Sequence, residues 1–349
     1  MAKRLAWLDY AKYICIMAVM IEHLESTTDE LLCFFSPFVV LTFFVVAGYT
    51  HRPGQPFRGF MWKKIKTLFV PWLVFSVFDI VVSQFVSFSE HESIWVELGR
   101  NFLQVRGYGD QLWFVAALFM AFIPFWCFVE LYSRKKATPS RRTLFIIIAL
   151  LLFVADSEYS KRMNPSLFPW GTSALPWHLE YIFQGMFYMT LGYMFRESWE
   201  PGFDRLNTHL GRLVLSAVYL LIIYLPYFVT IPESIFGISA VYVTPIIGIA
   251  VVFAFSKVIP ENKYMSYVGQ NTLICFAFHG KIYSFIQVML RRFAATFYAA
   301  VLSNDLYANL FAIAFTFVLS VILIIPAYII NRWFPFVLGR KHKAKPQRA

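Results

Sequence analysis

Long apolar runs separated by short polar segments set the pattern of this chain. Each run is continuous and about twenty residues long, the length at which an α-helix crosses the hydrocarbon core of a bilayer. A membrane-spanning β-strand would instead alternate apolar and polar positions over about ten residues. The pattern therefore predicts an all-α integral membrane protein with about ten transmembrane helices. The predicted helices cover residues 8–24, 31–49, 68–88, 112–132, 143–156, 178–195, 212–230, 236–256, 267–289 and 308–330, of which 143–156 is the shortest.

Composition supports the same fold class. Hydrophobic residues make up 59% of the 349 residues, charged residues make up 15%, and the mean hydropathy is +0.59. A soluble protein carries about 25% charged residues, and a single globular core cannot hide this much apolar surface from water. Because the loops are short and no internal repeat is evident, residues 1–349 are predicted to form one transmembrane domain.

The distribution of basic residues indicates how the chain is oriented. A net charge of +11 on a soluble protein would suggest a nucleic-acid partner, but here the basic residues flank apolar runs, so no nucleic acid is expected. Of the 31 lysines and arginines, Lys12 lies inside the first predicted helix and 23 lie on one side of the membrane. The other side holds seven, namely Arg100, Arg106, Lys161, Arg162, Lys281, Arg291 and Arg292. The positive-inside rule places both termini in the cytoplasm. The expected location is the plasma (inner) membrane.

The first predicted helix carries an unusual set of ionisable residues. Lys12 and His23 are eleven residues apart, so they lie roughly 20° apart around the helix axis and about 16 Å apart along it. Asp9 falls near the same face. Ionisable residues at membrane depth are costly and often functional. The alternative is that Asp9 and Lys12 merely pair at the interface and His23 extends toward the surface.

A second histidine, His279, lies in the apolar run 267–289. A single histidine on an apolar face is more often a packed core residue than a catalyst. Two histidines near the same depth on separate helices favour a functional role more strongly. Asp79 lies in the middle of another predicted helix and needs a buried partner, for which Lys12, Lys281 and a neutral hydroxyl are candidates. The cysteines are interpreted as packing residues, and no metal site is expected.

Three lysines, Lys63, Lys64 and Lys66, form a basic segment before Pro71 in a predicted loop on the cytoplasmic side. One interpretation is that they determine topology and lie beside the phosphates of membrane lipids. The other is that they hold the phosphates of an anionic cytosolic cofactor. Composition alone favours the first interpretation and leaves the second open.

Taken in order along the chain, these segments resemble acyltransferase family 3, the multi-pass membrane O-acyltransferases, and within it the fucose 4-O-acetylase-like branch. The residues that carry the resemblance are Asp9, Lys12 and His23, then Phe43-Phe44-Val45-Val46-Ala47-Gly48-Tyr49, Lys64, Leu112-Trp113-Phe114, Leu191-Gly192-Tyr193, and Gly269-Gln270-Asn271-Thr272-Leu273 with His279. Two positions depart from the family pattern. Lys12 stands where arginine is more common, and Thr67 stands at the second position of a basic pair, for which Lys63 or Lys66 is a substitute.

The resemblance implies transfer of an acetyl group from cytosolic acetyl-CoA to a carbohydrate acceptor, a sugar hydroxyl of an exopolysaccharide or other cell-envelope polysaccharide or of its lipid-linked precursor. It implies that His23 acts as general base, with Asp9 and His279 as further catalytic candidates. It also implies that Lys12, Lys63, Lys64 and Lys66 bind the acyl-CoA. Membrane lipid and the polysaccharide biosynthesis machinery are the expected partners.

Two other classes of function compete with this interpretation. A multi-pass exporter of a polysaccharide precursor or small molecule would also have many helices and buried polar residues. The missing internal repeat and the ordered motifs argue against it. A structural or sensor membrane protein gives no reason for Lys12 and His23 to share a helix face.

Overall fold

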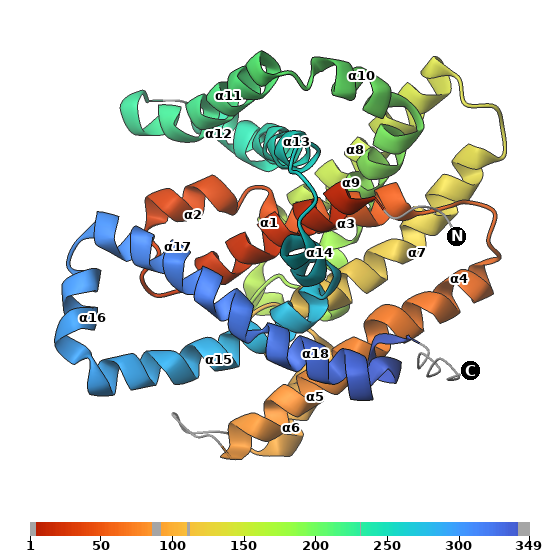
Figure 1. Ribbon diagram of the computed structural model, residues 1–349. Helices are drawn as coiled ribbons and strands as arrows, with labels where there is room; N and C mark the ends of the chain where they lie inside the picture. The colour runs from red at the N-terminus through yellow and green to blue at the C-terminus, as the bar shows by residue number, and fades with distance from the viewer. Residues whose placement is uncertain (1–4, 86–91, 110–111, 231, 341–349) are drawn as a thin grey trace, which may run out of the picture. The chain divides into compact units, whose positions relative to one another are not determined.

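The computed structural model describes residues 5–85, 92–109, 112–230 and 232–340 (Figure 1). Within these ranges the chain is built from helices and contains no strand, which confirms the predicted all-α class. The lysines and arginines at positions 3, 4, 341, 343, 345 and 348, which contribute to the charge asymmetry, lie outside the described residues. The chain folds as two compact units: the first comprises Met1–Val46 and Phe195–Ala327, and the second comprises Ala47–Met194 and Tyr328–Ala349.

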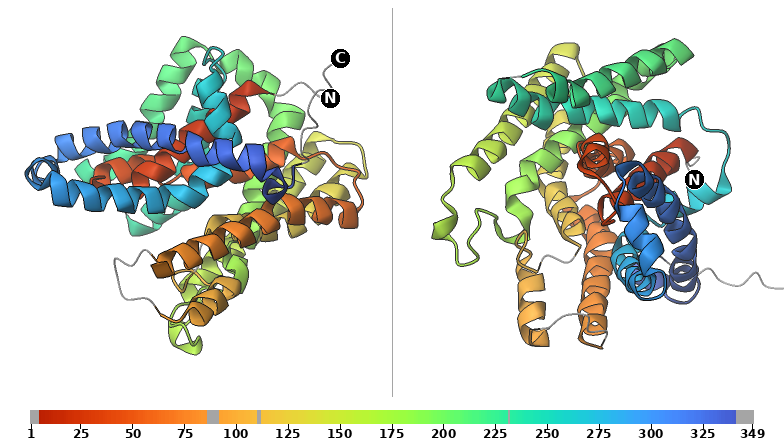
Figure 2. Two further views of the ribbon diagram at one scale, coloured as in Figure 1. Left: turned by 60° about the horizontal axis from the view of Figure 1, so that its bottom comes forward. Right: turned by 90° about the vertical axis from the view of Figure 1, so that its left-hand side faces the viewer.

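The first unit contains ten α-helices and two π-helical turns in the part of the chain that the structure describes. They are α1 (Ala6–Glu22), α2 (Asp29–Phe35), η4 (Phe195–Trp199), α10 (Glu200–Leu206), α11 (His209–Phe228), α12 (Glu233–Ile238), η5 (Ser239–Val243), α13 (Thr244–Ser256), α14 (Lys263–Gln270), α15 (Thr272–Phe293), α16 (Ala295–Leu302) and α17 (Asp305–Ile322). The helices α15, α16 and α17 form a hairpin, which is blue in Figures 1 and 2.

The second unit contains the helices between the two segments of the first unit and the last short turn. Its elements are α4 (Phe57–Lys64), η1 (Ile65–Phe69), α5 (Val70–Phe85), α6 (Ile94–Leu103), α7 (Trp113–Ser133), α8 (Pro139–Arg162), η2 (Pro165–Leu167), η3 (Pro176–Tyr181), α9 (Ile182–Met194) and η6 (Pro335–Leu338). Two further helices, α3 (Val39–Thr50) and α18 (Ile324–Trp333), contain the points at which the chain passes from one unit to the other.

Among the described residues, eight helical segments are long and apolar enough to cross a membrane. They are Asp29–Thr50, Phe57–Phe85, Trp113–Ser133, Pro139–Arg162, His209–Phe228, Glu233–Ser256, Thr272–Phe293 and Asp305–Trp333. Eight of the ten predicted helices correspond to these segments. The other two are helical but shorter, since α1 has 17 residues and α9 has 13.

Three predicted boundaries were wrong. The run 143–156 is part of α8, which has 24 residues and begins at Pro139 with the Thr138 hydroxyl accepting a hydrogen bond from the Arg141 backbone N–H. The run 267–289 is two helices, because Asn271 leaves helical geometry (φ −115°, ψ 21°) between α14 and α15. The basic segment around Lys64 is helical and not a loop, since helix continues from Phe57 to Phe85. In the first and third cases polar residues near a helix end hid its continuation, whereas in the second case a polar residue interrupts a run that was predicted as one helix.

A glycine sets how closely α14 packs on α1. A Cβ atom built on Gly269 would lie 1.9 Å from the backbone carbonyl oxygen of Asp9, far inside van der Waals contact. Only glycine fits at this position, so the two helices can approach closely. In the second unit, Gly48 plays the same part, because its Cβ would lie 1.8 Å from the carbonyl oxygen of Met189. Both glycines belong to sequence motifs noted above.

The segment that follows α1 is fixed to the α15–α17 hairpin. Ile21 and Leu24 are buried in one apolar cluster with Ala312 of α17. The Asn309 amide donates to the Thr28 hydroxyl at 2.9 Å, and its oxygen accepts from the Thr28 backbone N–H at 3.1 Å. These contacts hold the residues just beyond α1 in a defined position.

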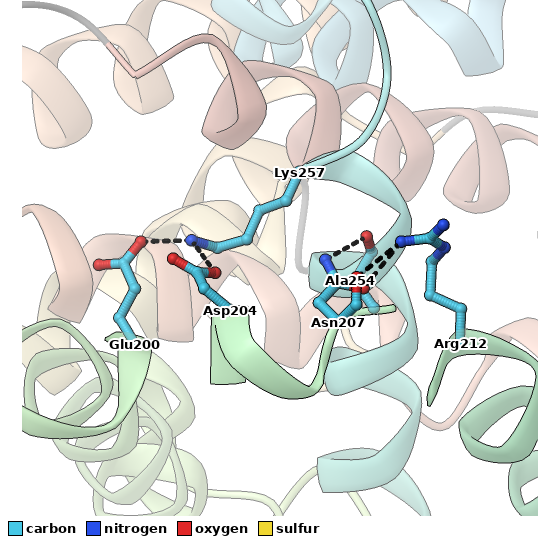
Figure 3. A network of polar contacts seen from close by, with 6 residues as sticks. All are labelled: Glu200, Asp204, Asn207, Arg212, Ala254 and Lys257. Carbon is cyan, nitrogen blue, oxygen red and sulfur yellow. Dashed lines mark hydrogen bonds and ion pairs between the residues drawn. The ribbon is translucent and has the colours of Figure 1, made fainter. Parts of the chain in front are cut away.

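A polar network connects α10, α11 and α13 within the first unit (Figure 3). The Lys257 ammonium pairs with Glu200 at 2.5 Å and with Asp204 at 2.9 Å, and it lies 4.5 Å from the centre of the Trp7 ring. Asn207 donates to the backbone carbonyl of Ala254 at 3.0 Å, and Arg212 donates to the backbone carbonyl of Asn207 at 2.9 Å. This network joins α10 and the start of α11 to the C-terminal end of α13.

Candidate active site

The structure brings His23 and His279 together. Their ring centroids are 4.9 Å apart with an interplanar angle of 85°, so the edge of one imidazole meets the face of the other. His23 ends α1 and is exposed, whereas His279 on α15 is buried with 6% of its surface accessible. The pair therefore joins an accessible imidazole to one shielded by the protein.

Hydrogen bonds define which nitrogen of each ring carries the proton. His23 Nδ1 lies 2.7 Å from the Val19 carbonyl oxygen, and His279 Nδ1 lies 2.9 Å from the Phe276 carbonyl oxygen and 3.1 Å from that of Cys275. A carbonyl oxygen only accepts, so each Nδ1–H must donate. In the neutral ring this leaves the Nε2 lone pair of each histidine available to take a proton. The Nε2 of His279 is buried and has no hydrogen-bond partner among the described residues.

Asp9 and Lys12 form a separate site on the same helix. The Lys12 ammonium lies 2.7 Å from Asp9 Oδ1, and the side chains are 21% and 4% exposed. Gln270 of α14 donates to Asp9 Oδ2 at 3.3 Å. At 1.5 Å per residue, Asp9 is about 21 Å from His23 along α1. Asp9 therefore contacts Lys12 and Gln270 and does not belong to the histidine pair.

The three lysines of the basic segment differ from one another in their surroundings. Lys64 is half-buried, and its ammonium lies 3.4 Å from the centre of the Phe122 ring in a cation–π contact. Lys63 is exposed, and Lys66 is exposed with its ammonium 4.9 Å from the centre of the Trp62 ring. All three lie in the second unit, where Ile65–Phe69 is a π-helical turn. Single π-helical turns are frequent at functional sites.

Sequence reasoning missed part of the surroundings of the site. Gln270 lies in the Gly-Gln-Asn-Thr-Leu motif, yet its contact with Asp9 gives that motif a physical role that the pattern alone did not show. Tyr283, Gln287 and Arg291 follow His279 at four-residue intervals, a spacing that is visible in the sequence and places side chains along one helix face. Asp79 is half-buried on α5 in the second unit.

The second unit holds a different polar pair. His178 is fully buried, and its Nδ1 lies 3.9 Å from Glu180 Oε1. The Trp113 ring of the Leu-Trp-Phe motif is 5.7 Å from that of His178. Trp177 and His178 both have positive φ values, 59° and 54°, which cost free energy for residues other than glycine. This segment is held in a strained backbone conformation by the residues packed around it.

Comparison with known proteins agrees with the motifs. A family model described as an acyltransferase domain, that of acyltransferase family 3, matches residues 5–329, a range that includes the His23–His279 pair, Lys12 and the three lysines of the basic segment. Neither the curated proteins nor the solved structures contain a match to this chain. Among the described residues, no group of three or more histidine, cysteine or acidic side chains is arranged to hold a metal ion.

Proposed function

This chain belongs to acyltransferase family 3 and is a membrane acyltransferase, and we propose on that basis that it O-acetylates a carbohydrate. The donor is acetyl-CoA from the cytoplasm. The acceptor is a sugar hydroxyl of a cell-surface or exported polysaccharide or of its lipid-linked precursor, as in the fucose 4-O-acetylase-like branch. The protein works in the plasma (inner) membrane beside the polysaccharide biosynthesis machinery.

The observation that carries this proposal is the contact between His23 and His279. His23 is exposed and its Nε2 is free to accept a proton, so it is the candidate general base. The sugar hydroxyl gives its proton to Nε2 while its oxygen attacks the thioester carbonyl of acetyl-CoA. The C–S bond then breaks, and the CoA thiolate takes the proton back from the imidazolium. The products are the sugar acetate ester and free CoA.

His279 supports this role from the neighbouring helix. Its ring lies against His23 at 4.9 Å, and its own Nδ1–H is fixed by two carbonyl oxygens. It therefore limits the orientations that the His23 ring can adopt, which a general base requires. We assign His279 as the residue that positions His23.

Positively charged side chains are the basis for the proposed binding of acetyl-CoA. Lys12 lies about three turns from His23 on α1 and is held by Asp9. In the second unit, Lys63 and Lys66 are exposed and can contact phosphate, while Lys64 is occupied by the Phe122 ring. Each unit thus has its own candidates for contact with the CoA phosphates: Lys12, oriented by Asp9, in the first unit, and Lys63 and Lys66 in the second unit, where Lys64 supports the helical segment that carries them.

The experiment that tests the function compares O-acetyl groups in the envelope polysaccharides of a deletion strain and of the same strain complemented with the wild-type gene. Proton NMR should show acetyl signals on a sugar only in the complemented strain. Equal acetylation in both strains would overturn the proposal. If the deletion strain instead stops exporting a polysaccharide that is still acetylated inside the cell, the protein is an exporter.

A further inference from the structure

The helix that carries His279 presents a line of polar side chains. His279, Tyr283, Gln287 and Arg291 recur every four residues, so each is about 6 Å further along α15 and turned by about 40° from the one before. These residues lie in a helix long and apolar enough to cross a membrane. Polar residues in such helices usually face the protein interior or a water-filled path.

Glu25 is the point at which this line meets the segment after α1. Its carboxylate accepts hydrogen bonds from Gln287 and from the guanidinium of Arg291, and from the Tyr298 hydroxyl at 3.2 Å. Its backbone N–H donates to the Tyr283 hydroxyl at 2.8 Å. Glu25 is only two residues from His23, so this cluster lies close to the proposed base.

The accessibility of this cluster distinguishes it from the Asp9–Lys12 pair. The Glu25 and Arg291 side chains are 39% and 56% exposed, whereas those of Asp9 and Lys12 are 4% and 21% exposed. An exposed ion pair contributes little to stability, so stability alone gives a weak reason for the arrangement. A guanidinium has five N–H donors, more than one carboxylate can accept, and a carboxylate has about four acceptor positions. The pair can therefore bind further hydroxyl groups.

We propose that Glu25, Gln287 and Arg291 form the subsite that binds the acceptor sugar beside His23. The inference rests on the function proposed above and identifies where the carbohydrate is recognised. Glu25 accepts hydrogen bonds from sugar hydroxyls next to the one that reacts, and Arg291 and Gln287 donate to hydroxyl or ring oxygens. Tyr283, which is half-buried between His279 and Gln287, fixes the backbone of Glu25.

Steady-state kinetics in membrane vesicles test this subsite, with acetyl-CoA as donor and the unacetylated polysaccharide of the deletion strain as acceptor. Glu25→Gln removes the charge and keeps the size of the side chain. It should raise the acceptor KM about 10- to 100-fold, the usual effect of losing a hydrogen bond to a charged group. The acetyl-CoA KM and the acceptor-independent release of CoA should stay at wild-type values, and the melting temperature should fall only slightly, because the ion pair is exposed.

Glu158→Gln is the matched control. Glu158 is 40% exposed and pairs with two cations, Lys161 at 3.2 Å and Arg162 at 3.0 Å, but it has no proposed role. This variant should have wild-type kinetics. Gln287→Ala leaves the Glu25–Arg291 pair in place, so it tests the same subsite if Glu25→Gln fails to fold, and it should also raise the acceptor KM.

The outcomes separate this inference from the function on which it rests. If the wild type transfers no acetyl group to the polysaccharide, both are overturned. If the wild type is active but Glu25→Gln and Gln287→Ala have an unchanged acceptor KM, only the subsite is overturned. A fall in kcat together with the melting temperature, at unchanged acceptor KM, would show that the cluster only fastens the segment after α1 and would also overturn the subsite.

Discussion

Gly269 of α14 lies against the backbone of Asp9 so closely that a Cβ atom would be 1.9 Å from the Asp9 carbonyl oxygen. Gly269→Ala should therefore push α14 away from α1 and destabilise the protein by at least the 1–3 kcal/mol that is typical of overpacking. The melting temperature in detergent measures this effect. Gly280→Ala is the control, because its Cβ would have nothing within 4 Å and alanine favours a helix. Equal melting temperatures for the two variants would contradict the close approach.

If His23 is the general base, replacing it should abolish acetyl transfer without lowering the amount of protein in the membrane. His23→Ala and His23→Gln should each lower O-acetylation by about 10²–10⁴-fold, the usual contribution of a general base. Glutamine is the sharper test, because it keeps hydrogen bonding but cannot take up the proton. NMR of the polysaccharide and immunoblots of the membrane fraction provide the measurements. Near wild-type acetylation in His23→Gln would exclude proton transfer at this position.

His279→Ala should have a smaller effect than His23→Ala if His279 only positions its neighbour. The variant keeps the base but removes the ring packed 4.9 Å from it. We expect kcat to fall while the acetyl-CoA KM stays the same. A loss as complete as that of His23→Ala would instead assign proton transfer to His279.

The roles proposed for the three lysines of the basic segment can be tested separately. Replacing both Lys63 and Lys66 with alanine should raise the acetyl-CoA KM strongly and leave the acceptor KM unchanged, because both side chains are exposed and can bind phosphate. Lys64→Met should mainly lower the melting temperature, since the Lys64 ammonium contacts the Phe122 ring. Initial rates at varied acetyl-CoA distinguish the two. If the double variant only reduces membrane insertion, the lysines determine topology and do not bind CoA.

The ion pair of Glu25 predicts a dependence of stability on pH. Hydrogen bonding to Arg291 lowers the pKa of the Glu25 carboxyl below its ordinary value of 4.5. A lowered pKa in the folded state adds stability above the unfolded pKa, and that stability is lost as the pH falls through the folded pKa. The melting temperature of the wild type should exceed that of Glu25→Gln slightly at pH 7, and the difference should shrink as the pH falls below 4.5 and disappear once the pH is below the lowered pKa of the folded state. A difference that persists in acid would rule out the pair as its cause.

The orientation of the chain can be tested by labelling single cysteines in a background without native cysteines. Ser140 lies in the first turn of α8 and Ser166 follows the end of this helix, and both are exposed. With both termini in the cytoplasm, a membrane-impermeant maleimide should label Ser140→Cys only after the membrane is opened and Ser166→Cys in intact cells. The reverse pattern would overturn the orientation and the cytosolic origin of the donor.

The sequence predicts the helices well where apolar runs are uninterrupted and less well where polar residues occur within a helix. The basic residues between Phe57 and Leu68 suggested a loop, although lysine stems can cover apolar surface while their charges stay accessible. The break at Asn271 was missed because the apolar residues on both sides of the short polar run 269–272 were interpreted as one helix, whereas the Asn271 backbone leaves helical geometry and its amide donates to the Tyr267 carbonyl at 2.8 Å. The local pattern of apolar and polar residues indicates which side chains are buried, but it does not show whether backbone hydrogen bonding continues from one turn to the next.

The same limit applies to the candidate site. Helical spacing predicts that Lys12 and His23 share one face, because Lys12 lies in α1 and His23 directly follows its last residue. The contact between His23 and His279 could not be predicted in this way, because it depends on how α1 packs against α15, and the spacing of residues within one helix gives no information about that packing. The role of Glu25 was missed for this reason, since its partners are more than 250 residues away along the chain.

The unbroken course of α1 has a consequence for changes in its length. Inserting one residue between Lys12 and His23 would turn the histidine by about 100° and move it by about 1.5 Å. The rotation would take the ring off the face of Lys12, whereas the shift in depth alone is small. An insertion of seven residues would nearly restore the face but displace the histidine by about 10 Å. The helix thus fixes both the angle and the separation of these two groups, and only insertions near a multiple of seven residues would change the separation while nearly keeping the angle.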